Sequence, residues 1–210
     1  MKLVISYNLP NLAKALELAQ QTAPFADIIG LGSALILKEG VNALTTFKTT
    51  FPNKEFFVEA KIIEKAEECV TMFASAGADY ISLLAGAHTS IIKKAVTTAK
   101  NCGVKLALDL VDAPSMGQSA LDAKTLGVNS IIAHRGQSQE EITYLENNWL
   151  NIAENTNLPL FISGKIDEAS LQQVIGLKPY GIIIGSAIIK SNNPVEKARM
   201  FYEQIANTQK

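Results

Sequence analysis

Eight short apolar runs divide this chain at nearly even intervals of about 25 residues. Most of these runs are continuous rather than alternating, which is typical of strands buried on both faces of a parallel sheet. The segments between them, such as 11–21, 64–76 and 90–100, place apolar residues at helical spacing. The chain therefore reads as a strand and a helix repeated eight times. The runs are 3–7, 27–31, 55–60, 80–84, 105–110, 130–134, 158–162 and 181–184.

Eight such units within 210 residues predict an α/β fold, a (β/α)8 TIM barrel, with residues 1–210 as a single domain. A doubly wound open sheet is the alternative. The count and the even spacing favour the barrel. The first loop, 8–11, lacks the glycine fingerprint of dinucleotide-binding folds, so no nucleotide cofactor is expected.

The charge balance excludes several classes of protein. Nineteen basic residues against 20 acidic ones give a net charge of −1, which offers no bulk attraction to nucleic acid. No apolar stretch approaches the roughly 20 residues needed to span a bilayer. The two cysteines do not make a disulfide framework. We expect a cytoplasmic protein with neither nucleic-acid nor membrane partners.

Charged residues stand at the carboxyl ends of several predicted strands, where barrels carry their chemistry. Glu59, Lys61 and Asp109 end runs that are otherwise apolar, and His134 and Arg135 close the sixth run. An unpaired buried charge is costly, so these groups need a partner or a chemical role. They form either an ion-pair network that caps the barrel or a catalytic site.

Two glycine-containing turns follow the seventh and eighth predicted strands. They supply Gly164 with Lys165, and Gly185 with Ser186. Loops at these two places commonly hold a phosphate in barrels, and glycine allows the backbone N–H groups to approach it closely. The four residues are therefore predicted to bind phosphate, although each turn alone would be a weak signal.

The segment Glu59-Ala60-Lys61-Ile62-Ile63-Glu64 resembles the Asp-x-Lys-x-x-Asp motif of the orotidine 5′-monophosphate decarboxylase suprafamily. Within it, the chain is most similar to the branch of hexulose-6-phosphate synthase and 3-keto-L-gulonate-6-phosphate decarboxylase. The similarity covers nearly the whole chain, including 76–80, 108–110, 133–134 and 184–188. It implies a ribulose-phosphate-binding barrel, a phosphorylated sugar as substrate, and a homodimer with active sites at the interface.

The resemblance also implies an enediolate intermediate, stabilised by Lys61 and a Mg²⁺ ion, because developing negative charge needs a preorganised cation. His134 would carry the proton, with Asp109 as its acidic helper, and Glu64 would reach across the dimer interface. Glu59 would be a partner of Lys61 or a residual metal ligand. The residues expected to contact the substrate are Asn8, Glu59 and Arg135.

Several positions depart from the family pattern. Asn8 stands where the family has a first-strand aspartate, and Gly30 stands where it has a metal-binding glutamate. Glu59 and Glu64 replace the motif aspartates. Mg²⁺ demands oxygen ligands in tight octahedral geometry, so these changes predict a weakened or displaced metal. Ser186 stands where the decarboxylases carry a phosphate-binding arginine, and this favours the synthase.

Three functions follow from this pattern. The preferred one is a lyase of the hexulose-6-phosphate synthase type, which adds formaldehyde to ribulose 5-phosphate. The second is a 3-keto-L-gulonate-6-phosphate decarboxylase, or a metal-free decarboxylase that uses the Lys61 cation as the orotidine branch does. The third is a sugar-phosphate-binding barrel that has lost both the metal site and catalysis.

Overall fold

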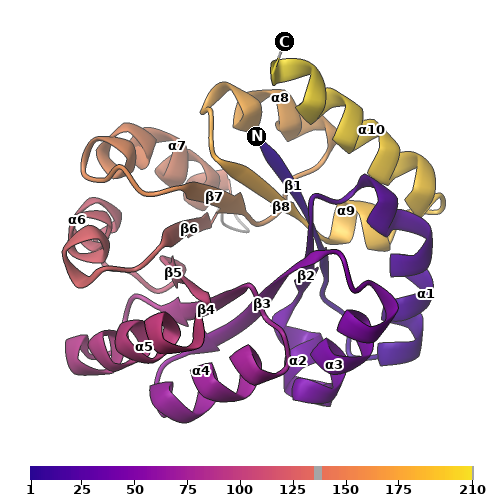
Figure 1. Ribbon diagram of the computed structural model, residues 1–210. Coiled ribbons are helices and arrows are strands. Elements are labelled where there is room, and N and C mark those ends of the chain that lie inside the picture. The colour runs from indigo at the N-terminus through magenta and orange to yellow at the C-terminus, as the bar shows by residue number, and fades with distance from the viewer. Residues whose placement is uncertain (135–138, 210) are drawn as a thin grey trace.

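The computed structural model describes residues 1–134 and 139–209, and eight parallel strands in it close into a barrel surrounded by helices (Figure 1). The strands follow one another around the barrel in chain order, and β1 pairs with β8 to close it. The predicted (β/α)8 barrel is confirmed, and the open sheet is wrong. The strands are β1 (Lys2–Tyr7), β2 (Ile28–Leu31), β3 (Glu55–Ile62), β4 (Tyr80–Leu84), β5 (Lys105–Asp109), β6 (Ser130–His134), β7 (Leu160–Ser163) and β8 (Gly181–Ile184).

Helices connect successive strands, and two helices rather than one follow β2 and β8. Capping residues explain several of their ends. Asn11 accepts the N–H of Lys14 at 2.9 Å and begins the first helix, and Gly103 takes a left-handed φ of 71° where α5 ends. The helices are α1 (Leu12–Thr22), α2 (Ser33–Glu39), α3 (Val41–Thr50), α4 (Ala66–Ser75), α5 (Thr89–Cys102), α6 (Met116–Leu126), α7 (Gln139–Glu154), α8 (Glu168–Gly176), α9 (Ser186–Ile189) and α10 (Pro194–Ala206), with 3-10 turns at Ala23–Phe25 and Asn207–Gln209.

An apolar layer fills the inside of the barrel, with one buried side chain from every strand. The rings of Phe57 and Tyr80 stack with centroids 5.3 Å apart, and Phe161 meets both rings edge-on. Such contacts pack the interior as a solid core. The members of the apolar layer are Val4, Ile28, Phe57, Tyr80, Ala107, Ile132, Phe161 and Ile183.

A polar layer lies directly above the apolar layer, toward the carboxyl ends of the strands. Side chains alternate between the two faces of a strand, so the residue two positions beyond each member of the apolar layer also points inward. At every one of these positions the sequence has a polar residue or glycine. The members of the polar layer are Ser6, Gly30, Glu59, Ser82, Asp109, His134, Ser163 and Gly185.

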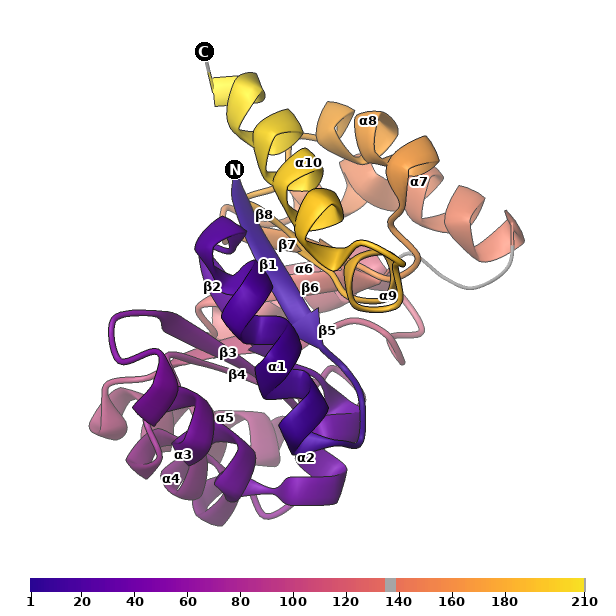
Figure 2. The same cartoon turned by 90° about the vertical axis from the view of Figure 1, so that its right-hand side faces the viewer.

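The chain begins and ends at the same side of the barrel. Figure 2 shows the start of β1 and the end of α10 near each other, away from the short helix α9. Because α9 follows the carboxyl end of β8, the polar layer opens on the side away from the termini. Within the described ranges, no helix is both long and apolar enough to cross a membrane.

Candidate active site

Three residues of the polar layer and its rim form a contiguous charged cluster. The Nζ atom of Lys61, on β3, lies 2.5 Å from Oδ2 of Asp109 at the end of β5. The Nε2 atom of His134, at the end of β6, lies 2.8 Å from the other carboxylate oxygen, Oδ1. Asp109 therefore bridges a cation and an imidazole, and the structure brings together three of the predicted catalytic residues.

The position of the Lys61 side chain depends on an unusual backbone conformation. Lys61 has a left-handed φ of 49°, at an irregularity in the pairing of β3 with β4. Its N–H donates to Oγ of the fully buried Ser82 at 2.9 Å. A left-handed conformation is unfavourable for a residue with a side chain, and such strain often accompanies functional positions. The Ser82 hydroxyl stabilises the bend that aims Lys61 at Asp109.

Asp109 is held as a carboxylate by its neighbours. Burial alone would raise its pKa, but His134 and Lys61 together outweigh burial and lower the pKa below its ordinary value of 3.8. The N–H of Val111 adds a further bond to Oδ1 at 3.0 Å. The contact between His134 and Asp109 is close, but within the described part of the chain Nε2 meets no acceptor in hydrogen-bond geometry. The imidazole of His134 is therefore placed against this carboxylate without a well-aligned hydrogen bond.

Glu59 is the second buried carboxyl of the polar layer, and only 9% of the residue is exposed. Oγ of Ser6 donates to its Oε1 at 2.5 Å. Burial raises the pKa of Glu59, although Ser6 and Lys61 partly oppose the increase. The close ion-pair partner of Lys61 is Asp109, so the predicted direct pairing of Lys61 with Glu59 is replaced by a more distant attraction.

A cavity of about 370 Å³ opens at the mouth of the barrel, next to Glu59. It brings together six residues predicted to bind substrate or phosphate, and also Ser6, Ser163 and Lys190, which the sequence did not single out. Lys165 has a left-handed φ of 40° directly after Gly164 with a φ of 93°. The predicted residues that line the cavity are Asn8, Glu59, Gly164, Lys165, Gly185 and Ser186.

The residues present do not fit the Mg²⁺ site that the resemblance implies. At Gly30 an added Cβ would lie 3.1 Å from Cα of Ser6 and 3.3 Å from the carbonyl oxygen of Ile5, so the backbone of β1 crowds any side chain there. Both oxygens of Asp109 already have partners, and Ser6 holds Glu59. Among the described residues, no three acidic, histidine or cysteine side chains are grouped as a metal site would need.

Three predicted residues lie outside this cluster or contribute to it differently. Oδ1 of Asn8 accepts the N–H of Ala34 at 2.8 Å, and Asn8 also lines the cavity at the barrel mouth. Glu64 is exposed in the loop after β3 and does not line the cavity of its own chain. Arg135 lies outside the described residues.

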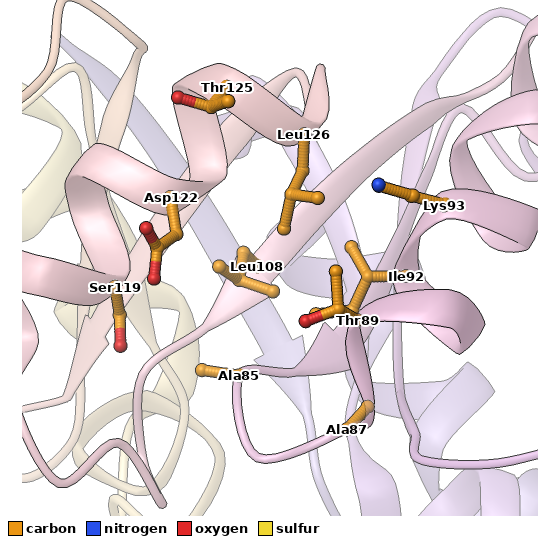
Figure 3. Close-up of a pocket in the computed structure, with 10 residues that line it drawn as sticks. All are labelled: Ala85, Ala87, Thr89, Ile92, Lys93, Leu108, Ser119, Asp122, Thr125 and Leu126. Atoms are coloured by element: carbon orange, nitrogen blue, oxygen red, sulfur yellow. The ribbon is translucent and has the colours of Figure 1, made fainter.

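A second cavity, of about 420 Å³, lies outside the barrel between α5 and α6. Figure 3 shows Ile92, Leu108 and Leu126 together within it, with Lys93 on one side and Asp122 on the other. It contains none of the residues predicted for catalysis or phosphate binding. The chemistry is therefore assigned to the barrel mouth.

Strand periodicity is the signal that would have identified the missed serines. Ser6, Ser82 and Ser163 each lie two positions beyond a member of the apolar layer, so the alternation of faces places them inside the barrel. Lys190 has a different signal, because it follows Ser186 by four positions. Residues with that spacing lie on the same face of a helix.

Comparison with known proteins identifies relatives along nearly the whole chain. A profile of the orotidine 5′-phosphate decarboxylase / HUMPS family matches residues 1–201. The chain is 28% identical over 203 residues to 3-hexulose-6-phosphate synthase from Bacillus subtilis, covering 94% of this chain and 95% of the relative. It is 28% identical over 207 residues to the Mycobacterium gastri protein of that name, covering 98% and 100%. The crystal structure of 3-hexulose-6-phosphate synthase from Salmonella typhimurium has a TM-score of 0.91 at 24% identity, over 99% of each chain.

Proposed function

Because the chain belongs to the orotidine 5′-phosphate decarboxylase / HUMPS family, we propose that it is a carbon–carbon lyase that adds formaldehyde to ribulose 5-phosphate. The observation that carries the proposal is the contact of Asp109 with both Lys61 and His134 at the barrel mouth. A fixed cation and a proton carrier thus share one carboxylate. Formation of an enediolate intermediate requires both a group that removes a proton and a cation that stabilises the resulting negative charge.

The proposed reaction begins when His134 removes a proton from carbon 1 of ribulose 5-phosphate. The electron pair of the broken C–H bond forms the enediolate, whose negative charge the ammonium group of Lys61 stabilises. Carbon 1 then attacks formaldehyde, a carbon–carbon bond forms, and the new alkoxide takes the proton back from His134. Asp109 fixes Lys61 and lies against the imidazole of His134.

The cavity at the barrel mouth supplies the proposed phosphate end of the site. Gly164 and Gly185 place backbone close to it, and the hydroxyl of Ser186 and the ammonium of Lys165 add polar donors. Glu59 and the amide of Asn8 line the same cavity and are proposed to contact the sugar hydroxyls. A ketose phosphate would then extend from Lys61 to these turns.

Catalysis without a divalent metal is part of this proposal. Gly30 offers no side-chain ligand, and the carboxylates of Glu59 and Asp109 do not form a group suited to Mg²⁺. Stabilisation of the negative charge on the enediolate is therefore assigned to Lys61. The same observation favours a second candidate, a metal-free decarboxylase in which Lys61 stabilises the carbanion left by carbon dioxide. Both candidates use one cation, and the substrate tests below separate them.

A homodimer with interface active sites is also proposed. Glu64 is exposed in the loop after β3, and the apolar residues Ile63 and Val111, which follow the carboxyl ends of β3 and β5, are each 51% exposed. Light scattering should give the mass of two chains. Because Glu64 would serve the partner's site, mixing inactive Lys61→Ala and Glu64→Gln variants should restore about a quarter of the activity, from mixed dimers with one intact site. No recovery in a mixture proved to exchange subunits would exclude a shared site.

We propose a cytoplasmic location for the enzyme. Cys69 and Cys102 are both free, and Cys102 is exposed, which suits a reducing compartment. Separation of soluble and membrane fractions from the native cell, followed by immunodetection, would test this.

Two measurements test the proposed reaction. Exchange of the carbon 1 proton of ribulose 5-phosphate in heavy water reports the enediolate, whatever electrophile follows. Formation of a hexulose 6-phosphate on addition of formaldehyde reports the complete reaction. Both should persist in EDTA. Loss of both in EDTA would contradict the metal-free mechanism, whereas binding without exchange would identify a non-catalytic sugar-phosphate-binding barrel.

A further inference from the structure

Lys190 borders the cavity at the barrel mouth, although no strand ends there. It is the residue that follows α9, and its backbone N–H donates to the carbonyl oxygen of Ser186 at 3.1 Å. This bond closes one helical turn, so residues 186 and 190 lie on the same side of it. Both side chains belong to the lining of the cavity.

The charges around this cavity are few and unevenly placed. Among the described residues that line it, Glu59 is the one with a carboxyl group, which is buried and bound by Ser6. The lining also has two lysines, Lys165 and Lys190. Within the described part of the chain, the ammonium group of Lys190 has no ion pair and no hydrogen bond. The exposed ammonium group of Lys190, which is unpaired among the described residues, thus lies at the rim of a cavity that the turns at Gly164 and Gly185 also line.

A phosphate monoester carries between one and two negative charges at neutral pH and requires compensating charge. The hydroxyl of Ser186 can donate one hydrogen bond but carries no charge. The resemblance places an arginine at position 186 in the decarboxylases. A lysine four residues later can reach the same space, because one turn of helix carries its side chain back to the same face.

We propose that Lys190 binds the phosphate group of the substrate and supplies the positive charge that Ser186 lacks, displaced by one helical turn. The ligand class is a phosphomonoester dianion, and the inference rests on the proposed function for the sugar attached to it. Lys190 then determines selectivity for phosphorylated over unphosphorylated sugars. Since Lys190 is exposed, salt should weaken its contribution by screening.

The test compares Lys190→Met with Lys94→Met. Lys94 is an exposed lysine on α5 and lines neither cavity, so its replacement makes the same change in net charge elsewhere. Calorimetric titration with inorganic phosphate measures the site without reference to any reaction. A charge-assisted hydrogen bond is worth about 1.5–3 kcal/mol, which corresponds to a loss of about tenfold or more in affinity. We expect this loss in Lys190→Met and wild-type affinity in Lys94→Met.

Steady-state kinetics and the recovery of phosphate affinity in a double variant provide two further tests. Lys190→Met should raise KM for ribulose 5-phosphate about tenfold and change kcat little, because Lys190 is proposed to bind the phosphate and not the reacting carbon. Adding Ser186→Arg to Lys190→Met should restore phosphate affinity. Equal phosphate affinity in wild type and Lys190→Met, equal weakening in Lys94→Met, or no phosphate binding by wild type would overturn the proposal. If phosphate binding depends on Lys190 but ribulose 5-phosphate shows no exchange, the assigned reaction fails and the phosphate site stands.

Discussion

The ammonium group of Lys61 lies 2.5 Å from a carboxylate oxygen of Asp109, although the two residues are 48 positions apart in the sequence. The contact joins β3 to β5 across the barrel mouth, and 28% of the lysine side chain is exposed there against 2% of the aspartate side chain. The buried carboxylate fixes one end of the pair. The accessible ammonium is left to face a ligand.

Replacement of Lys61 by alanine should lower kcat by about a thousandfold, because it removes the preorganised cation that faces the enediolate. Lys65→Ala is the matched control, since Lys65 also has a positive φ, of 52°, and is exposed in the same segment. Steady-state kinetics and circular dichroism of both variants check this. Near-normal activity of a folded Lys61→Ala variant would remove Lys61 from the mechanism.

Ser82→Ala should lower kcat about 10- to 100-fold and leave KM almost unchanged, because the bend that aims Lys61 loses its hydrogen-bond acceptor. Ser130→Ala is the control: Ser130 is also a buried strand serine, but its hydroxyl has no hydrogen-bond partner among the described residues. Its removal should leave both activity and the free energy of unfolding at or above wild type. Similar kinetic losses in the two variants would mean that Ser82 contributes only to packing.

Glu59→Gln should change how stability depends on pH. The pKa of Glu59 is raised in the folded state, so between its ordinary value of 4.5 and that raised pKa the folded protein holds a proton that the unfolded chain has lost. Wild-type stability therefore falls as pH rises through this window, and the glutamine variant escapes that loss. Urea unfolding from pH 4 to 8 should show a free-energy advantage for Glu59→Gln that grows as the pH rises. An advantage that shrinks as pH rises would contradict the raised pKa.

Gly30→Glu should fail to create a Mg²⁺ site. The new side chain meets the backbone of β1, which costs about 1–3 kcal/mol of stability through overpacking. Thermal unfolding with and without Mg²⁺ measures both effects, and Gly176→Glu, at a position with open space around it, controls for the added charge. A Mg²⁺-dependent increase in melting temperature in Gly30→Glu alone would show that the barrel accommodates the metal.

The sequence predicted the barrel well because parallel strands buried on both faces leave continuous apolar runs. Three of the predicted runs, 80–84, 130–134 and 181–184, have the bounds of β4, β6 and β8. The family resemblance is likewise confirmed by the match over residues 1–201. The runs did not reveal the bend at Lys61, since a left-handed lysine leaves no pattern in composition or spacing.

Which side chains contact one another in the site was harder to predict than which residues belong to it. Lys61, Asp109 and His134 were expected at strand ends, but which carboxylate contacts the lysine depends on strand register and on the bend in β3. Glu59 is nearer to Lys61 in sequence than Asp109 is. Its carboxylate nevertheless accepts a hydrogen bond from Ser6 on β1. The roles of Glu64 and Arg135 stay predictions, to be decided by the dimer and substrate experiments.

The rings of Phe57 and Tyr80 stack and Phe161 meets both edge-on, so a packed aromatic floor lies beneath the polar layer of the barrel. We therefore expect sugar phosphate, formaldehyde and product to pass through the barrel mouth, at the carboxyl ends of the strands. In the proposed reaction the enediolate forms before it attacks formaldehyde, so formaldehyde must reach carbon 1 beside a ketose phosphate that is already bound. Any molecule or subunit that covers the rim controls entry and exit together.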